Sequence, residues 1–481
     1  MTSSKPTLRP RLTLVAASLA LSCAAMGTAQ AAATIVINNL NAPGVGFNDM
    51  TPATPVGGNT GTTIGQQRLI AFTHAANIWG RTLTSAVPIV INATFRPLAC
   101  TATGAVLGSA GATQVFADFP GAPKAGTIYS YALANKLYGS EISDRPGGQI
   151  NANFNSELGK PNCLAGSSFY LGLDANEGNN IDFVATLLHE MGHGLGFQTF
   201  TNGATGAKFA GYPSVWDHNL LDNTTNKLWV DMTNAERAAS ALKPSGLSWT
   251  GARVTAAVPS VLAATPQLRV VGAGDHSAGG DMYAVGEADF GPKLDKSPLT
   301  GQIVQVAMQA DSAGSACTPF NAANAAAVRR NIALVSRGTC GFTVKVKNAQ
   351  DAGAIGVIVA DNAPGAVTGL GGADPTIMIP AVRVTQADGA MIVAGLAKPN
   401  GDTAGTVARF ERSKTSSSGT DAQRRITMFT PNPFQPGSSV SHFNTTATRN
   451  QLMEPSISAD LSHSVTAPVD LTFELFKDIG W

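Results

Sequence analysis

The sequence predicts an α+β protein whose chain is interrupted by a smaller α/β domain. Two patterns support this prediction. One segment, 181–200, has the apolar spacing of a helix, and residues 332–360 have the strand–helix–strand pattern of a buried parallel sheet. The chain has 481 residues, which is longer than one hydrophobic core usually supports. We therefore expect two or more domains.

The first 31 residues are typical of a secretory signal peptide. Basic residues open the segment: Lys5, Arg9 and Arg11. An apolar stretch, 12–26, and the small-residue cleavage pattern of Ala29 and Ala31 follow. No later segment is long and apolar enough for a membrane helix. We expect a secreted protein; a periplasmic location or lipid attachment at Cys23 are the weaker alternatives.

Composition indicates which kinds of partner are disfavoured and whether the cysteines form disulfides. The net charge is +1 and only 13% of residues are charged, so the sequence does not favour nucleic acid as a partner. Four cysteines follow the leader: Cys100, Cys163, Cys317 and Cys340. An even number in an exported chain predicts two disulfides, and proximity in the sequence favours pairing the first two and the last two. The sequence does not indicate an oligomeric state.

The segment "IDFVATLLHEMGHGLGFQTF" carries the strongest chemical signal. Its apolar positions make one helical face: Val184, Leu187, Leu188, Met191 and Leu195. Asn180 is the predicted N-cap, with Asp182 in the first turn. His189 and His193 are four residues apart and project from the same side of the helix, so both imidazoles can reach one zinc ion. Glu190 stands where it can act on a water molecule without binding the metal.

A catalytic zinc normally has three protein ligands. Gly196 predicts a sharp turn after the helix, and in the H-E-x-x-H-x-x-G-x-x-H pattern such a turn leads to a third histidine. Thr199 occupies that position here. The candidates that remain are His442, His218 beside Asp217, and His463, whereas His276 falls in the inserted region. A glutamate ligand such as Glu236 is disfavoured, because Gly196 would then break the helix without a reason.

At this point the sequence resembles a known family. "HEMGHGLGF" followed much later by "SHF…NQLMEP" is similar to the leishmanolysin-type metzincins. The resemblance implies a zinc protease domain with a twisted mixed sheet and an active-site helix. It also implies His189, His193 and His442 as zinc ligands, Glu190 as general base and Met453 as the Met-turn methionine. The resemblance covers the helix and the last ~45 residues, where 471–481 resemble the closing helix of such domains.

The inserted region has its own signature. We predict a strand at 332–336, a helix at 343–352 capped by Gly353, and a strand at 355–360. The stretches "VSRGTCGFTVKVKNAQDAGAIGVIVAD" and "IPAVRV" resemble a protease-associated (PA) domain. The expected organisation is a leader at 1–31, a catalytic part at 32–260, the PA-like domain at 261–412 and the rest of the catalytic part at 413–481. The ends of an inserted domain must lie close together.

Together these features predict a secreted zinc endopeptidase that acts on proteins or peptides, with Glu190 as general base. The alternatives are an extracellular binding or adhesion protein with a vestigial zinc site, and a zinc hydrolase of non-peptide amides. Residues 147–159 are predicted to supply the edge strand along which a substrate lies. Residues 174–182 carry oxygen ligands suited to Ca²⁺, although a plain acidic loop is the simpler interpretation.

Overall fold

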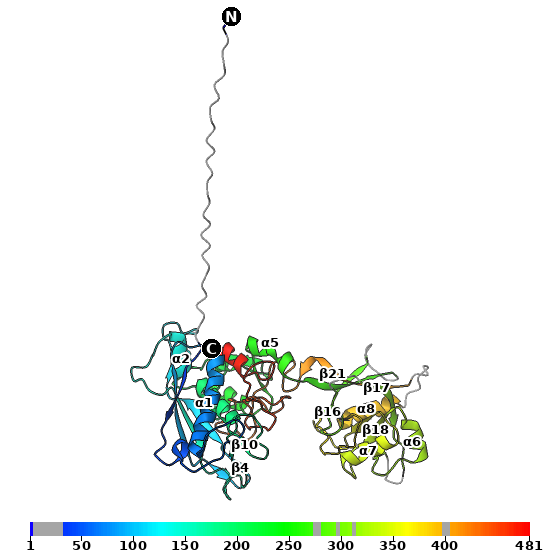
Figure 1. Ribbon diagram of the computed structural model, residues 1–481. Helices are drawn as coiled ribbons and strands as arrows, with labels where there is room; N and C mark the ends of the chain where they lie inside the picture. The colour runs from blue at the N-terminus through cyan, green and yellow to red at the C-terminus, as the bar shows by residue number, and fades with distance from the viewer. Residues whose placement is uncertain (3–31, 273–279, 295–298, 310–313, 397–404) are drawn as a thin grey trace.

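A computed structural model describes residues 1–2, 32–272, 280–294, 299–309, 314–396 and 405–481. Residues 3–31 of the predicted leader, which include Cys23, and His276 fall outside the described residues. The N-terminal and C-terminal parts of the chain form one lobe, and the middle of the chain forms a second (Figure 1). Among the described residues, no helix is both long and apolar enough to cross a membrane.

The first lobe is built on a four-stranded sheet in the order β1-β2-β8-β5. Its strands are β1 (Ile35–Asn39), β2 (Ile89–Arg96), β8 (Ile150–Asn155) and β5 (Gly108–Ala112). The first three run parallel, and β5 runs antiparallel to β8. Alternate residues of β2 are buried, as a strand with one covered face requires.

The predicted edge strand at 147–159 is therefore wrong. The strand at this place, β8, lies between β2 and β5, and β5 is the edge. The reason is that β5 has the sequence Gly-Ser-Ala-Gly-Ala, which has no apolar alternation. Only its pairing with β8 makes it a strand.

Helices α1 (Ile64–Thr82) and α3 (Phe183–Leu195) pack on one face of this sheet. Phenylalanine side chains fill the space between them: Phe47, Phe72, Phe95, Phe154 and Phe183. The Trp79 indole N–H donates to the Leu188 carbonyl at 3.1 Å and joins the two helices. Every residue of α3 is buried, so its position is fixed from all sides.

The C-terminal part returns to this lobe and ends in α9 (Thr472–Ile479). Trp481 donates from its indole N–H to the Leu195 carbonyl at the end of α3, at 2.9 Å. The lobe also contains α2 (Tyr131–Tyr138), α4 (Asn234–Ser240), α5 (Ala252–Val261), β11 (Leu220–Asp222), β12 (Lys227–Leu228) and β13 (Leu247–Trp249). Two-residue strands complete it: β3 (Cys100–Thr101), β4 (Gly104–Ala105), β6 (Val115–Phe116), β7 (Tyr129–Ser130), β9 (Phe169–Tyr170) and β10 (Ile181–Asp182).

The second lobe contains an eight-stranded sheet in the order β15-β14-β21-β17-β18-β19-β20-β16. Its strands are β14 (Ala264–Val271), β15 (Asp281–Ala284), β16 (Gly286–Glu287), β17 (Leu299–Gln305), β18 (Ile332–Ser336), β19 (Gly356–Ala360), β20 (Ala381–Val384) and β21 (Val407–Ser417). Its helices are α6 (Ala322–Val328), α7 (Phe342–Asp351) and α8 (Gln386–Leu396). Strands β17 to β20 are parallel. The predicted strand–helix–strand unit is thus present, with boundaries shifted by at most one residue.

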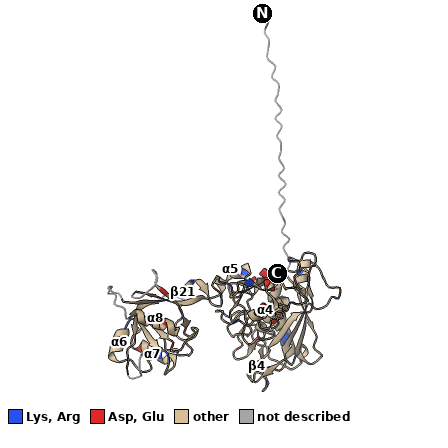
Figure 2. Cartoon of the chain, turned by 180° about the vertical axis from the view of Figure 1, so that it is seen from behind, with Lys and Arg blue, Asp and Glu red and all other residues tan. Residues whose placement is uncertain are grey.

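The two lobes are joined by β14 and β21, which pair in antiparallel fashion from Ala264 opposite Ser417 to Val271 opposite Val407. The Ser418 N–H donates to the Ala263 carbonyl at 2.9 Å, so the chain leaves and re-enters the first lobe at one point. Because β21 is part of this connection, the second lobe continues past the expected limit at 412. Each lobe has its own hydrophobic core. Acidic and basic residues are interspersed along both lobes (Figure 2).

Candidate metal centre

Helix α3 begins at Phe183 with Asp182 as its N-cap, and the carboxylate of Asp182 accepts the Ala185 N–H at 3.0 Å. The prediction of Asn180 as N-cap is wrong. Its side-chain oxygen accepts the Ser168 N–H instead. The helix ends at Gly196, whose φ of +123° is strained for any other residue, and its N–H reaches the Gly192 and His193 carbonyls. Between these two ends, both histidines lie on the side of α3 that lines the cavity.

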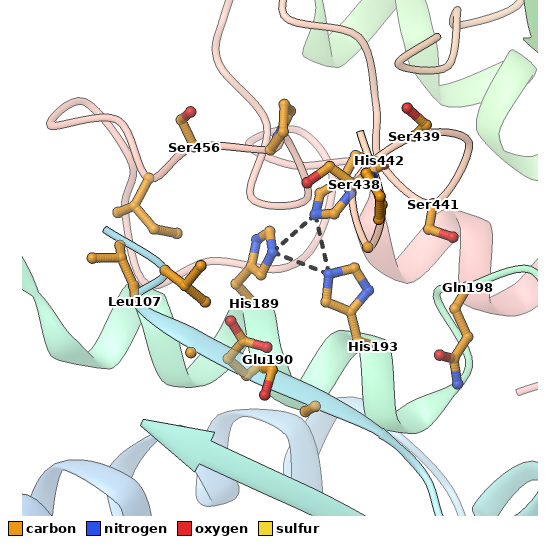
Figure 3. A pocket seen from close by; sticks show the side chains of 18 of the residues that line it. Leu107, His189, Glu190, His193, Gln198, Ser438, Ser439, Ser441, His442 and Ser456 are labelled. Atoms are coloured by element: carbon orange, nitrogen blue, oxygen red, sulfur yellow. Dashed lines mark hydrogen bonds between the residues drawn. The ribbon is translucent and has the colours of Figure 1, made fainter. Parts of the chain in front are cut away.

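Three imidazoles converge above α3 (Figure 3). The Nε2 atom of His193 lies 3.1 Å from Nε2 of His189 and 3.1 Å from Nε2 of His442, and the third separation is 3.2 Å. A tetrahedral zinc with bonds of about 2.1 Å would hold its ligand atoms about 3.4 Å apart. The triangle is therefore close to the size that such an ion requires. No other group of three His, Cys, Asp or Glu side chains among the described residues can hold a metal.

The backbone fixes the tautomer of each histidine. Each Nδ1 lies 2.8 Å from a carbonyl oxygen: that of Leu452 for His189, Phe197 for His193 and Ser438 for His442. A carbonyl only accepts, so each Nδ1 carries the proton and each Nε2 presents a lone pair. Three lone pairs then face one another without a proton between them. The three lone pairs repel one another, and a cation bound at their centre would remove this repulsion.

Burial keeps the three rings neutral. It lowers the pKa of His189 to about 4 and that of His193 to about 3, and repulsion by His189 adds to the second shift. The pKa of His442 also lies well below its ordinary value, first because of burial and then because of the other two rings. Neutral imidazole is the form that binds a metal. The residues present therefore fit a zinc ion.

The other predicted candidates lie elsewhere. Nε2 of His218 is 3.0 Å from the Thr127 hydroxyl, and Nε2 of His463 is 2.7 Å from the Asp182 carboxylate. Glu236 closes the capping box of α4 with Thr233 and pairs with Lys227. Of the histidines within the described residues, the structure brings only His442 to His189 and His193.

Glu190 lies beside the three histidines, buried under the edge strand β5. A Cβ atom on Gly108 would be 2.8 Å from its Oε1 atom, so β5 can approach only because this position is glycine. Burial raises the pKa of Glu190 to about 8, and a hydrogen bond from the Ala110 backbone opposes the rise. Sequence reasoning missed Gly108, because no local pattern indicates what lies against a glycine.

Met453 packs against α3. A Cβ atom on Gly192 would lie 2.7 Å from the Met453 sulfur, which places this methionine directly against the helix between the two histidines. The neighbouring Leu452 carbonyl accepts from His189, and the Leu452 N–H donates to Asp470 at 2.7 Å. Asp470, which the sequence did not indicate, thus supports the turn that orients a histidine.

Thr199 occupies the position of the third histidine in the H-E-x-x-H-x-x-G-x-x-H pattern. Its hydroxyl donates to Asp217 at 2.6 Å, and its N–H donates to the Ser441 hydroxyl at 3.2 Å, next to His442. Asp217 also accepts from the Thr201 hydroxyl at 2.7 Å and from the Ser214 N–H at 2.8 Å. The loop after α3 is therefore fastened both to Asp217 and to the segment that carries His442.

These groups open into one cavity of about 930 Å³. Residues 104–110 form one side, α3 forms the floor, and the opposite side consists of 198–203 with Phe434, Pro436–Ser439 and Ser441, here called the loop wall. Residues 455–457 close one end. Every lining residue belongs to the first lobe.

Two further predictions concern disulfides and calcium. The structure pairs Cys100 with Cys163 and Cys317 with Cys340, as proximity in the sequence favoured. The acidic groups proposed for calcium are used differently: Asp174 accepts from the Tyr170 hydroxyl and Asp182 caps α3. The structure gives the calcium prediction no support within the described residues.

Comparison with known proteins identifies one part of the chain. Residues 299–392 match the family model of the PA domain. A "Receptor homology region, transmembrane domain- and RING domain-containing protein 1" from Oryza sativa subsp. japonica is 36% identical over 107 residues, 22% of this chain and 19% of that protein. The second lobe thus contains a PA domain.

Solved structures that resemble the chain include proteases. BSAP, a zinc aminopeptidase from Bacillus subtilis, is 19% identical with a TM-score of 0.21, over 33% of this chain and 35% of that one. An aminopeptidase from Aneurinibacillus sp. strain AM-1 is 19% identical with a TM-score of 0.22, over 41% of each chain. This chain therefore spans about a fifth of the curated relative and about two fifths or less of these structures. Such low TM-scores establish no shared overall fold.

Proposed function

We propose that this protein is a secreted zinc endopeptidase of the leishmanolysin-like metzincin type, with a PA domain inserted between its zinc ligands. The observation that carries the proposal is the set of three unprotonated Nε2 atoms, from His189, His193 and His442, beside the buried carboxyl of Glu190. The two disulfides support an oxidising, extracytoplasmic location.

A zinc ion bound by the three histidines would polarise the scissile carbonyl and lower the pKa of a water molecule. Glu190 then takes the proton of the attacking water and delivers it to the leaving amine. The edge strand β5 is positioned to pair with an extended substrate, because its outer side is the free edge of the sheet. Met453 packs against α3 at Gly192, between the two histidines.

The cavity favours internal peptide bonds over chain ends. Of the described residues that line it, Glu190 is the only Asp, Glu, Lys or Arg. An aminopeptidase needs an acidic group for the substrate's ammonium, and a carboxypeptidase needs a basic group for its carboxylate. The cavity offers neither besides the proposed general base.

Zinc content and digestion of an unfolded protein test the proposal. We expect His442→Ala to lose most of its zinc and its activity while remaining folded, because one of three ligands is removed. Glu190→Gln should keep its zinc and lose activity by about 10²-fold or more, since proton transfer is removed. His218→Ala, a histidine outside the site, is the matched control and should keep both.

Full zinc in His442→Ala with intact proteolysis would place the third ligand elsewhere. Unchanged function in Glu190→Gln would favour a binding protein with a vestigial site. A zinc-loaded protein that leaves every polypeptide intact would instead favour hydrolysis of non-peptide amides.

A further inference from the structure

The sheet of the first lobe has a second edge, at β1, on the side away from β5. Along residues 34–40, the even-numbered residues direct their backbone hydrogen bonds to β2. Because this direction alternates from one residue to the next, the N–H and C=O groups of Ile35, Ile37 and Asn39 face away from β2. Within the described residues, these outward groups have no hydrogen-bond partner. Strand β1 can therefore pair with one more strand.

The edge at β1 lacks the features that usually protect an open strand, which are charged side chains, proline or a bulge. From 32 to 48 the chain has no Asp, Glu, Lys or Arg, and β1 contains no proline. Its register with β2 is regular. Apolar side chains are exposed along the same stretch of chain: Val36, Leu40, Val45 and Met50. An open, uncharged edge beside exposed apolar side chains is a surface suited to another β-strand.

We infer that the partner is a second copy of this chain, and that the two β1 strands pair in antiparallel fashion around Ile37. A strand that pairs with itself brings its own charges together, which is unfavourable for a charged edge. The absence of charge in β1 removes that obstacle. Each copy uses the same surface in this pairing, so the association closes as a dimer and does not continue into a fibre.

The outward backbone groups define the register of the pairing. With Ile37 opposite Ile37 of the second copy, Ile35 lies opposite Asn39, and every outward N–H and C=O of the three residues gains a partner. A shift toward either end would bring Ala33 or Asn41 into the pairing. The Ala33 N–H already donates to the carbonyl that follows α1, and the Asn41 N–H donates to the Asn39 side chain, both at 3.0 Å.

In this register, Val36 lies opposite Asn38 of the second copy on the outer face of the sheet. The Asn38 amide donates to Asn92 at 2.8 Å, and the Asn92 amide donates to Asn151 at 3.1 Å, so a row of amides crosses the sheet up to β1. The pairing joins the strands of both copies into one sheet with β5 at its two ends. No residue of β1 lines the cavity, so the cavity of each copy stays accessible.

The test places charges at the two positions that face each other. Val36→Lys combined with Asn38→Lys sets lysine opposite lysine, and Val36→Glu combined with Asn38→Glu sets glutamate opposite glutamate. Both side chains are exposed, so each variant should fold, which thermal unfolding checks. In sedimentation equilibrium we expect a dimer for the wild type and a dimer dissociation constant about tenfold higher or more for each variant. An equimolar mixture of the two variants should dimerise again, because opposite charges then face each other.

The matched control is Val344→Lys combined with Met378→Lys, which adds the same charge at exposed apolar residues of the second lobe. It should dimerise as the wild type does. A wild type that is monomeric at every concentration up to its solubility limit would overturn the inference. So would a dimer that neither β1 variant weakens, a mixture of these variants that stays monomeric, or a control that loses the dimer equally.

The inference does not depend on the proposed function, since it involves neither the histidines nor Glu190. A dimer that responds to the β1 variants but hydrolyses no polypeptide would support this inference and overturn the peptidase. A monomer that digests unfolded proteins would do the reverse.

Discussion

Gly108 is the residue on which the position of Glu190 depends. A methyl group at this place would lie 2.8 Å from Cγ and Oε1 of Glu190, closer than side chains approach one another. We expect Gly108→Ala to displace the carboxyl and lower kcat by about 10²-fold, because misplacing a catalytic group by about 1 Å has effects of that size. The zinc content should not change, since no histidine is touched. Steady-state kinetics and elemental analysis measure both.

Gly111→Ala is the matched control for this prediction, because it adds the same methyl group to the same strand. Its Cβ would meet only the Gln198 side-chain oxygen, at 3.6 Å, which is an ordinary contact. We expect this variant to keep kcat. If both variants lost activity equally, the effect would belong to the strand and not to Glu190.

Glu454 makes stability depend on pH. Burial raises the pKa of this carboxyl from an ordinary value of 4.5 to about 7. Between these values the folded protein binds more protons than the unfolded chain, so this residue lowers the free energy of unfolding as the pH rises. Glu454→Gln keeps an oxygen for the Gln451 N–H and removes the titration. We expect the Tm of the variant relative to the wild type to rise from pH 4.5 to 7 and then level off.

Thermal unfolding at several pH values checks this prediction. A difference in Tm between the two proteins that is constant from pH 4.5 to pH 8 would show that the carboxyl titrates normally. The two proteins are compared at the same pH. The effects on Tm of the groups that titrate elsewhere in the chain therefore cancel in the difference.

At the scale of elements, the turn 451–454 connects the group of three histidines to the C-terminal helix. Asp470, just before α9, accepts the Leu452 N–H at 2.7 Å and the Thr472 N–H at 2.8 Å. The Leu452 carbonyl in turn orients His189. We expect Asp470→Ala to weaken zinc binding by about 10- to 100-fold, the usual effect of losing support for a ligand. A competition titration with a chelator measures it.

Asp460→Ala controls for the loss of an acidic residue in the same segment. Within the described residues, its carboxylate accepts a side-chain hydrogen bond only from the half-buried Asn450 and has no link to a histidine. Zinc affinity should be unchanged in this variant. Equal weakening in both variants would mean that the effect is electrostatic and not transmitted through the turn.

At the scale of the whole molecule, the two lobes have separate hydrophobic cores and share one connection. Buried core residues of the first lobe stop at Leu262 and resume at Ile426. Ala263 and Ser418 already share a hydrogen bond, so a short linker can replace residues 264–417. We expect this deletion variant to fold, bind zinc and cleave blocked hexapeptides at a rate within about threefold of the full chain, because a domain with its own core folds independently.

The same deletion examines what the PA domain does. Faster cleavage of folded proteins with unchanged cleavage of peptides would indicate that the domain restricts access to the cavity. Loss of zinc from a variant that remains folded would contradict the independence of the two lobes. Circular dichroism and thermal unfolding establish whether it is folded.

Features that depend on neighbouring residues in the chain were predictable. The apolar spacing of α3 placed His189 and His193 on one side of a helix, and the continuous apolar runs of β18 and β19 indicated buried parallel strands. The helix cap was displaced from Asn180 to Asp182, which is the size of error expected at an element boundary. Local periodicity reports which face is buried, but not what covers it.

The sequence by itself determined the helix that carries His189 and His193, the PA domain and the set of histidines from which a third member of the group could come. Tertiary structure decided which histidine joins the other two, that β5 rather than β8 is the edge strand, and that Asp470 and Gly108 support the site. The physical reason is distance along the chain. His442 meets His193 across 249 residues, and Gly108 meets Glu190 from another element, so only the packing of the folded first lobe brings these groups together.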